Sequence, residues 1–302
     1  MSGVSSEIKL IIGSLCTIIF EMFIGHILEI FKIQKQISGD SYKIIYKRLT
    51  KNKGIIGIWD GYFPWGFIMA MFKGASFTYG QVITYQLLSK YGSNYMDDIY
   101  LYVISASLGG AIQGIVMSPL LLLKTRVITS PKFREIKGGV YETTIESFKI
   151  GYFIIKNDGI MGLTVGMTLF SFKRFCDWLT RFLFVELLFK YISVLFNIEQ
   201  NILRNNVLCI TMIGLFGGVL SALSTSVLDV LTSLTQQHKS KKTASKKDDN
   251  NRNNKKFLRG LGLRILHVAL TVVLMKDVVK YAIYLVEIYF YQTDSSQAKP
   301  DL

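Results

Sequence analysis

Long apolar stretches constrain this chain more than any other feature. Six of them occur, at residues 8–34, 62–90, 97–125, 166–194, 205–235 and 260–291. Each is long enough for the ~20 helical residues that cross a ~30 Å hydrocarbon core. Half of the residues are hydrophobic and the mean hydropathy is +0.34, which is too apolar for an ordinary soluble domain. The pattern predicts an all-α membrane protein with six transmembrane helices.

Basic residues are the second constraint, because the formal net charge is +14. Residues 35–60 and 126–160 hold six Lys or Arg each, and residues 236–259 hold nine. The other side of the membrane would carry about four, namely Lys9, Lys90, Arg204 and Lys299. This asymmetry orients the helices and puts both termini on the less basic side. The surplus favours an anionic partner, but no soluble basic domain is present, so nucleic acid is not expected.

Enzyme, metal and redox chemistry find no support in the sequence. Cys16, Cys176 and Cys209 lie far apart in apolar stretches and suggest neither disulfides nor a zinc site. Three histidines offer no zinc-type or Ser–His–Asp arrangement. No cofactor or metal is expected, and the start of the chain lacks the basic segment of a cleavable signal.

An internal repeat with a period near 100 residues organises the chain. "GIIGIWDG" at 54–61 and "GIMGLTVG" at 159–166 share their glycine spacing, and Gly109–Gly110 aligns with Gly217–Gly218. Three two-helix units are predicted within one domain, at 1–92, 93–198 and 199–302. The segment 236–256 is polar and charged without apolar periodicity, which predicts a disordered basic loop.

The odd-numbered stretches end in related motifs. They read "ILEIFKIQ" from Ile27, "PLLLLKTR" from Pro119 and "VLDVLTSL" from Val227. The third position holds, in turn, Glu29, Leu121 and Asp229, and the sixth holds Lys32, Lys124 and Thr232. This arrangement resembles the mitochondrial carrier family, whose odd helices end in proline, any residue, an acid, two residues, and Lys or Arg. The resemblance covers nearly the whole chain.

The residues also favour one direction of pairing around a ring. Pairing each acid with the base of the next unit gives Glu29–Lys124 and Asp229–Lys32, and the third pair has lost both partners. The opposite direction would leave two unmatched charges, which a low-dielectric environment penalises. We therefore interpret Glu29, Lys32, Lys124 and Asp229 as a matrix-side gate. The alternative for Lys124 is that it extends to a basic interface, as Arg126 would.

Ionisable residues inside the even-numbered stretches indicate a binding site, because such groups are costly in lipid. Lys173, Asp177 and Arg181 share one helical face, with Arg174 beside them. Lys73 stands alone in the second stretch, and Arg264, His267 and Thr271 share a face of the sixth. These cations predict a multiply charged anion. The alternatives are that Asp177 only neutralises Lys173 or Arg181, and that His267 is a satisfied core histidine.

The same segments are similar to those of the family's fungal citrate and oxoglutarate carriers and its tricarboxylate carriers. The likeness rests on "FPWGFIMAMFKGASF", "MSPLLLLKT", "KRFCDWLTRF" and "KDVVK". It implies substrate binding by Lys73, Lys173, Arg174 and Arg181, and a cytoplasmic-side gate at Asp277 and Lys280. The repeat offset places His267 over Lys173 and adds it to the expected substrate-binding residues. The departures are Arg174 where an amide is usual, Asp177 where Asn is usual, and His267 where Arg is frequent.

The resemblance implies a carrier that exchanges di- or tricarboxylates such as citrate by alternating access. It also implies a monomer in the mitochondrial inner membrane, with both termini toward the intermembrane space. The expected partners are a small organic anion and membrane lipids such as cardiolipin. The alternatives are a carrier-derived scaffold that no longer transports, a carrier of another organic anion, and a peroxisomal location.

Overall fold

The computed structural model describes residues 6–92, 96–136, 139–236, 259–273, 278–279, 281–286 and 288. Within these ranges every regular element is a helix, which agrees with the all-α class predicted from the sequence.

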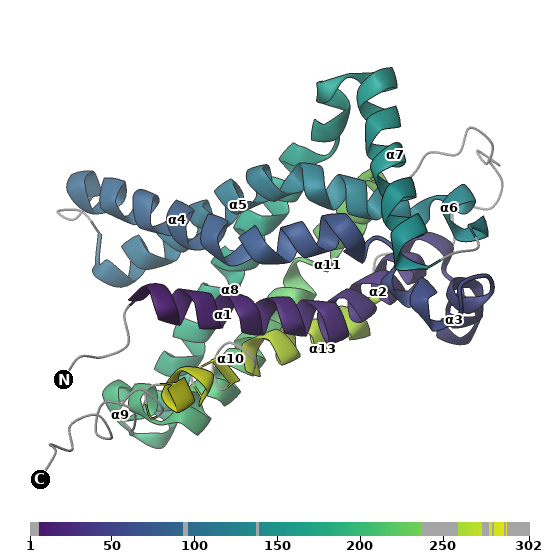
Figure 1. Cartoon of the computed structure of the whole chain (residues 1–302). Coiled ribbons are helices and arrows are strands. Elements are labelled where there is room, and N and C mark those ends of the chain that lie inside the picture. The colour runs from purple at the N-terminus through teal and green to yellow at the C-terminus, as the bar shows by residue number, and fades with distance from the viewer. Residues whose placement is uncertain are drawn as a thin grey trace, which may run out of the picture.

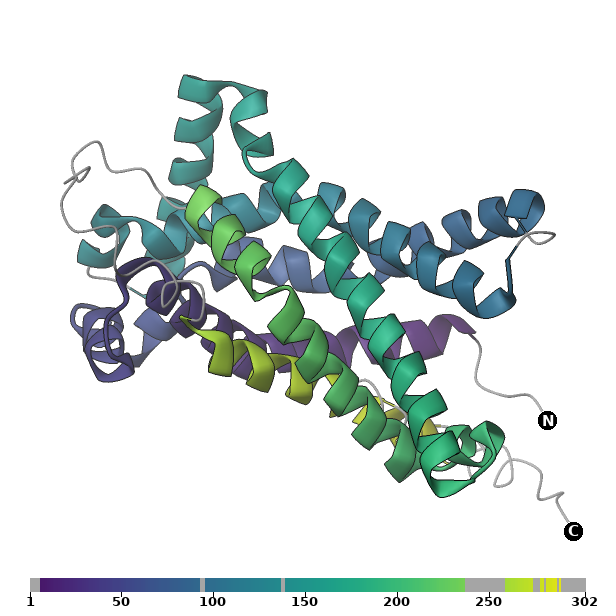
Figure 2. The same ribbon diagram turned by 180° about the vertical axis from the view of Figure 1, so that it is seen from behind.

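The long helices follow one another around a bundle in chain order (Figure 1). A first rod of α1 (Ser6–Phe20), the π-helical turn η1 (Glu21–Gly25) and α2 (His26–Ser38) contacts α4 (Phe67–Gly92). The succession continues through α5 (Asp98–Thr129), α8 (Met167–Phe196) and α10 (Val207–Ser224) with α11 (Ser226–Gln236). Figure 2 shows α8 beside α10 and α11. Finally α13 (Leu261–Val273) contacts both α10 and α2, so that the last described rod returns to the first.

Four helical segments of the described chain are long and apolar enough to cross a membrane: Ile11–Ser38, Gly54–Tyr91, Asp98–Thr129 and Val207–Ser224. Helix α13 is apolar but shorter. Helix α8 is long enough at 30 residues, but Lys173, Arg174, Asp177 and Arg181 are concentrated in its first half. Such charges are tolerated in a membrane helix when they face the interior of the bundle.

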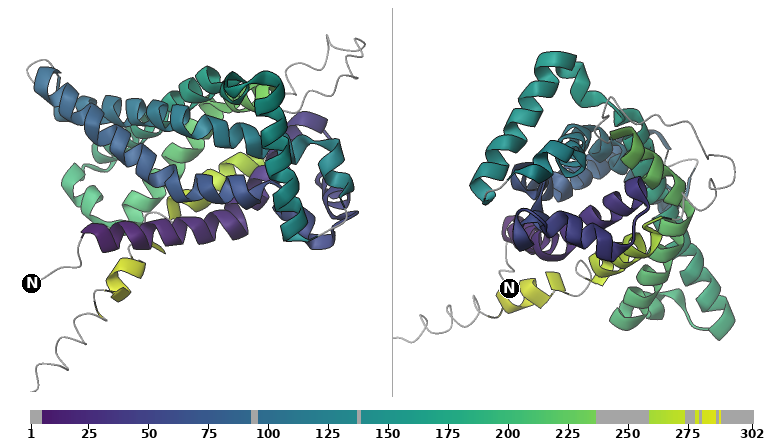
Figure 3. Two further views of the ribbon diagram at one scale, coloured as in Figure 1. Left: turned by 45° about the horizontal axis from the view of Figure 1, so that its top comes forward. Right: turned by 90° about the vertical axis from the view of Figure 1, so that its right-hand side faces the viewer.

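Short connections and long ones lie at opposite ends of the bundle. Helices α3 (Tyr42–Thr50), α6 (Pro131–Glu135) and α7 (Val140–Asp158) gather at one end, and α9 (Gln200–Asn205) lies at the other (Figure 1). Helix α7 runs across the rods (Figure 3). The segment "SYKIIYKRLTKN" has apolar residues at helical spacing and contains α3, whose Ile45 and Leu49 are buried against Ile30 and Ile33.

Glycines allow α5 and α10 to approach their neighbours closely. A Cβ on Gly109 would lie 2.7 Å from the backbone nitrogen of Gln81 in α4, and one on Gly110 would lie 2.2 Å from Trp178 in α8. The aligned pair behaves alike, because Gly217 faces α8 and Gly218 faces α13. Small residues at such crossings bring backbones together, and van der Waals packing holds membrane helices in contact.

A second set of glycines bends the chain into the even-numbered helices. Gly61, Gly166 and Gly260 have φ angles of +81°, +78° and +77°, a left-handed conformation that other residues rarely adopt. Gly61 precedes the short π-helical turn η3 (Tyr62–Gly66) that leads into α4, Gly166 directly precedes α8, and Gly260 directly precedes α13. The same backbone turn therefore begins three rods that lie about 100 residues apart in the chain.

The close approach of α5 to α8 can be tested at Gly114, where a Cβ would lie 2.6 Å from the Cα of Ser171. We expect Gly114→Ala to destabilise the protein by about 1–3 kcal/mol, because the clash is with backbone and α8 must shift. The measurement is the thermal unfolding midpoint in detergent. Gly74→Ala is the control, since no atom lies within 4 Å of a Cβ there and alanine favours helices. Equal midpoints for the two variants would contradict this packing.

Candidate functional site

Two ion pairs join the ends of α2, α5 and α11. The Nζ of Lys124 donates to the Oε2 of Glu29, and the Nζ of Lys32 lies 3.2 Å from the carboxylate of Asp229. Lys124 is 1% exposed and Asp229 is 3% exposed, so both pairs lie away from solvent. The direction of pairing is the one that the three motifs favoured. The alternative in which Lys124 extends to an interface is wrong, because this amine is buried against Glu29.

The positions that lack charges are also buried in this region. Leu121 packs with Met69, Met117 and Phe170, and the hydroxyl of Thr232 donates to the backbone carbonyl of Leu228. Apolar packing at Leu121 and a locally satisfied hydroxyl at Thr232 leave no unpaired charge at either position. The ends of these helices are therefore joined by two ion pairs and an apolar contact.

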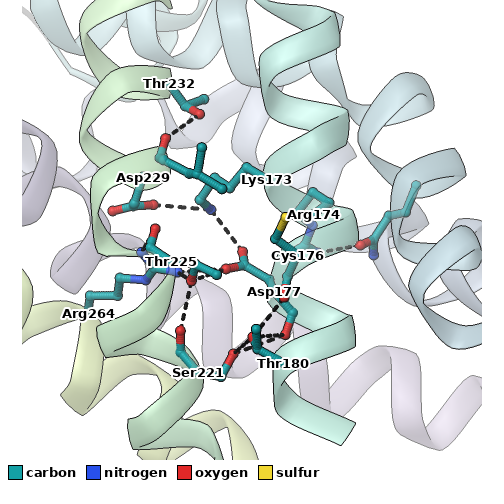
Figure 4. Close-up of polar contacts among 12 residues, drawn as sticks. Lys173, Arg174, Cys176, Asp177, Thr180, Ser221, Thr225, Asp229, Thr232 and Arg264 are labelled. Carbon is teal, nitrogen blue, oxygen red and sulfur yellow. Dashed lines mark hydrogen bonds and ion pairs between the residues drawn. The ribbon is translucent and has the colours of Figure 1, made fainter. Parts of the chain in front are cut away.

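Asp177 is the centre of a second group of charges, midway along the bundle. Its Oδ2 lies 3.2 Å from the Nζ of Lys173 and its Oδ1 lies 2.7 Å from Nη2 of Arg264. The hydroxyl of Thr225, between α10 and α11, also donates to Asp177 (Figure 4). Nη1 of Arg264 donates to the backbone carbonyl of Thr225 at 2.8 Å. Asp177 therefore does neutralise Lys173, as one interpretation proposed, but its other cation is Arg264 and not Arg181.

Lys173 connects the two groups. Its Nζ lies 3.1 Å from the Oδ1 of Asp229, between that carboxylate and Asp177 (Figure 4). Asp229 also accepts a hydrogen bond from Nε2 of Gln36 at 2.8 Å. The pair Lys32–Asp229 and the mid-bundle group around Asp177 are thus one continuous network. Any anion that binds Lys173 would change the contacts of both Asp229 and Asp177.

Arg174 and Arg181 are the cations of α8 that take no part in this network of ion pairs. Arg174 donates to the amide oxygen of Gln113, whose Nε2 in turn donates to the backbone carbonyl of Lys73. The guanidinium of Arg181 lies 5.0 Å from the ring centroid of Trp178. Within the described ranges, neither arginine forms an ion pair with a carboxylate. Both are therefore available to an anionic ligand.

Lys73 has a counterion from a distant part of the chain. Its Nζ lies 2.5 Å from the Oε1 of Glu21 in η1, and Nε2 of His267 lies 3.9 Å from the same oxygen. The ring of His267 also packs edge-on against Phe20, with centroids 6.1 Å apart. Lys73 has no acidic neighbour within its own helix, and the structure supplies one from the first rod.

Sequence reasoning therefore identified the cations of the bundle interior but missed several of their partners. Glu21, Gln113 and Thr225 were not singled out. Glu21 could have been found, since a lone acid inside the apolar run "IIFEMFIG" is costly unless it is paired. Gln113 and Thr225 carry no such signal, because uncharged polar residues are common in membrane helices. Asp277 and Lys280, expected at a cytoplasmic-side gate, lie outside the described residues.

The charge balance of the interior defines what the site can hold. Among the described side chains of the bundle interior, the cations are Lys32, Lys73, Lys124, Lys173, Arg174, Arg181 and Arg264, and the anions are Glu21, Glu29, Asp177 and Asp229. Three positive charges remain uncompensated when the histidines are neutral. Buried charge of one sign is unfavourable without a counterion. The interior is therefore suited to an anion that carries two or three negative charges.

The pair Lys124–Glu29 can be tested by a double-mutant cycle. Lys124→Met should lower the free energy of unfolding by about 3–5 kcal/mol, because it leaves the Glu29 carboxylate buried without a partner. Glu29→Gln combined with Lys124→Met should recover most of that loss, since neither charge remains. The thermal unfolding midpoint of the wild type, both single variants and the double variant gives the coupling. A double variant no more stable than Lys124→Met would show that the pair does not form.

Comparison with known proteins agrees with this arrangement. Residues 96–194 match the family described as "Mitochondrial carrier protein". Over 147 residues the chain is 26% identical to "Mitochondrial substrate carrier family protein ucpB" of Dictyostelium discoideum. Over 99 residues it is 35% identical to the "Probable mitochondrial 2-oxoglutarate/malate carrier protein" of that organism. Over 137 residues it is 26% identical to the "Citrate/oxoglutarate carrier protein" of Saccharomyces cerevisiae.

These matches cover only part of this chain and part of each relative. They cover 46%, 30% and 45% of this chain, and the chain spans 47%, 29% and 41% of the relatives' own lengths. The family match includes α5, α7 and nearly all of α8, so it contains Lys124 and the whole charged face of α8. The match, the names of the relatives and the apolar helices together support membership of the mitochondrial carrier family, and residues 96–194 are the part of the chain that matches it directly.

Proposed function

We propose that this protein exchanges di- or tricarboxylates across the mitochondrial inner membrane by alternating access. The observation that carries the proposal is the uncompensated positive charge of the interior, which includes Arg174 and Arg181. A substrate with two or three carboxylates would supply the missing counterions. Two of the relatives are named for carboxylates of this kind.

The gate in this proposal consists of the pairs Glu29–Lys124 and Lys32–Asp229. Both are formed here, so this state would be closed at the end that bears α3 and α7. That end is the basic one, which faces the matrix in the proposed orientation, with both termini toward the intermembrane space. Substrate entering from the opposite side would reach Arg174 and Arg181. It would then compete with Asp177 and Asp229 for Lys173, which weakens the closed gate and favours the alternate state.

The six-helix, three-repeat arrangement at 1–92, 93–198 and 199–302 belongs to the same proposal. It is supported by the recurring left-handed glycine before α8 and α13 and ahead of η3–α4, and by the aligned glycine pairs of α5 and α10. The proposal includes a monomer. A non-transporting scaffold is the second candidate, favoured by the loss of the third gate pair at Leu121 and Thr232.

Exchange by reconstituted protein tests the proposal directly. Liposomes loaded with unlabelled citrate would be given labelled citrate, with 2-oxoglutarate, malate, phosphate and ATP as competitors. Saturable uptake that carboxylates inhibit and ATP does not is the expected result. Folded protein that takes up no carboxylate would contradict the proposal and favour the scaffold.

Arg174→Gln and Arg181→Gln test the substrate site without disturbing its ion pairs. We expect each to reduce citrate uptake about tenfold or more, because a hydrogen bond to a charged group contributes about 1.5–3 kcal/mol. Thermal stability should be kept or raised, since each change removes a buried charge that has no carboxylate partner. Uptake is measured in liposomes and stability in detergent.

Arg204→Gln is the matched control, because Arg204 pairs with Glu186 at the end of the bundle, outside the charged interior. Its uptake should equal that of the wild type. Unchanged uptake in the double variant Arg174→Gln/Arg181→Gln would exclude these arginines from the substrate site.

A further inference from the structure

The carboxylate of Glu21 lies in a place built to hold it. Glu21 is 5% exposed and begins the π-helical turn η1, within an apolar run. Gly25 makes room for it, because a Cβ there would lie 2.5 Å from the Oε2 of Glu21. Single π-helical turns inside α-helices occur frequently at functional sites. A carboxylate with a dedicated space inside a membrane bundle is costly, so it needs a partner or a proton.

Lys73 is the close cationic partner of this carboxylate, at 2.5 Å. The lysine side chain is 28% exposed, whereas that of Glu21 is 7% exposed. An anion arriving in the bundle can therefore reach Lys73, while Glu21 stays behind it. The substrate and Glu21 would then compete for one ammonium group.

No other ionisable group around Glu21 fully replaces Lys73 as its counterion. Those that interact electrostatically with Glu21 are His26 and Glu29 of α2, Tyr62 of η3, Lys124 of α5, Arg174 of α8, and His267 of α13. Lys124 is already bound to Glu29, and Arg174 donates to Gln113. His267 is the next nearest group, at 3.9 Å. A Glu21 carboxylate that lost Lys73 would remain buried without a full counterion.

We propose that Glu21 takes up a proton when an anion occupies Lys73, so that anion transport is coupled to co-transport of a proton. This inference rests on the proposed function. The proton comes from water on the side from which the anion enters, and binds the Glu21 carboxylate to give a neutral carboxylic acid. When the anion leaves, Lys73 returns to Glu21 and the proton is released to water. A buried carboxylate that is displaced from its cation becomes neutral more readily than it stays charged.

Proton uptake on binding tests the coupling separately from transport. The binding enthalpy of 2-oxoglutarate to detergent-solubilised protein would be measured near pH 7 in buffers of different ionisation enthalpy. Both carboxyl groups of 2-oxoglutarate are ionised at this pH, so the ligand takes up no proton itself. The wild type should take up about one proton per bound anion, as the linkage of one titrating group requires.

Three variants test whether Glu21 is the group that binds the proton. Glu21→Gln should bind the anion with equal or higher affinity and take up no proton, because the competing carboxylate is gone. Lys73→Met should also take up no proton when it binds the anion, since Glu21 is then protonated before the anion arrives. Glu186→Gln, which removes a carboxylate at the end of the bundle, should keep the wild-type value.

Three outcomes overturn the proposal in distinguishable ways. Wild-type binding without proton uptake would exclude coupling while leaving the carrier function standing. Undiminished proton uptake by Glu21→Gln would assign the proton to another group. The variant His267→Asn would then test whether that group is His267. Folded protein that binds neither 2-oxoglutarate nor citrate would overturn the proposed function, and this inference with it.

Discussion

Placing several charges inside an apolar bundle is the constraint on which the rest of this structure depends. The desolvation of a buried ion costs several kcal/mol, and it is offset only by close partners of opposite charge. Asp177 and Asp229 meet this need together, because each contacts Lys173 and each has a further cation, Arg264 or Lys32. The network joins α2, α8, α11 and α13, so the rods are held by charge as well as by packing.

The close packing of the helices supports this network. Glycines of α5 and α10 let the backbones approach, which places polar side chains of neighbouring rods within hydrogen-bond distance. Gln113 illustrates the result, since one amide group connects the backbone of α4 with Arg174 of α8. A loosely packed bundle would leave such groups facing lipid, where nothing satisfies them.

The same network explains how binding and gating would be linked in the proposed carrier. Lys173 contacts Asp229 of the gate and Asp177 of the mid-bundle group, so an anion at Lys173 frees carboxylates in both. Such an exchange of partners favours one state over another only if the anion interacts differently with the two. Glu21 and Lys73 form a second pair of this type, between η1 and α4. One anion that displaced the carboxylate partners of both Lys173 and Lys73 would therefore change contacts on separate helices.

The sequence by itself determined the helical class, the resemblance to a carrier family and the direction in which Glu29 pairs with Lys124 and Asp229 with Lys32, because these depend on local hydropathy and on residues at fixed spacing. It also identified the cations of α8, since charges inside an apolar stretch stand out against their neighbours. Only the tertiary structure decided the partners of the other charges. Glu21 reaches Lys73 across 52 positions and Arg264 reaches Asp177 across 87. Such contacts follow from how the rods pack, which no local pattern contains.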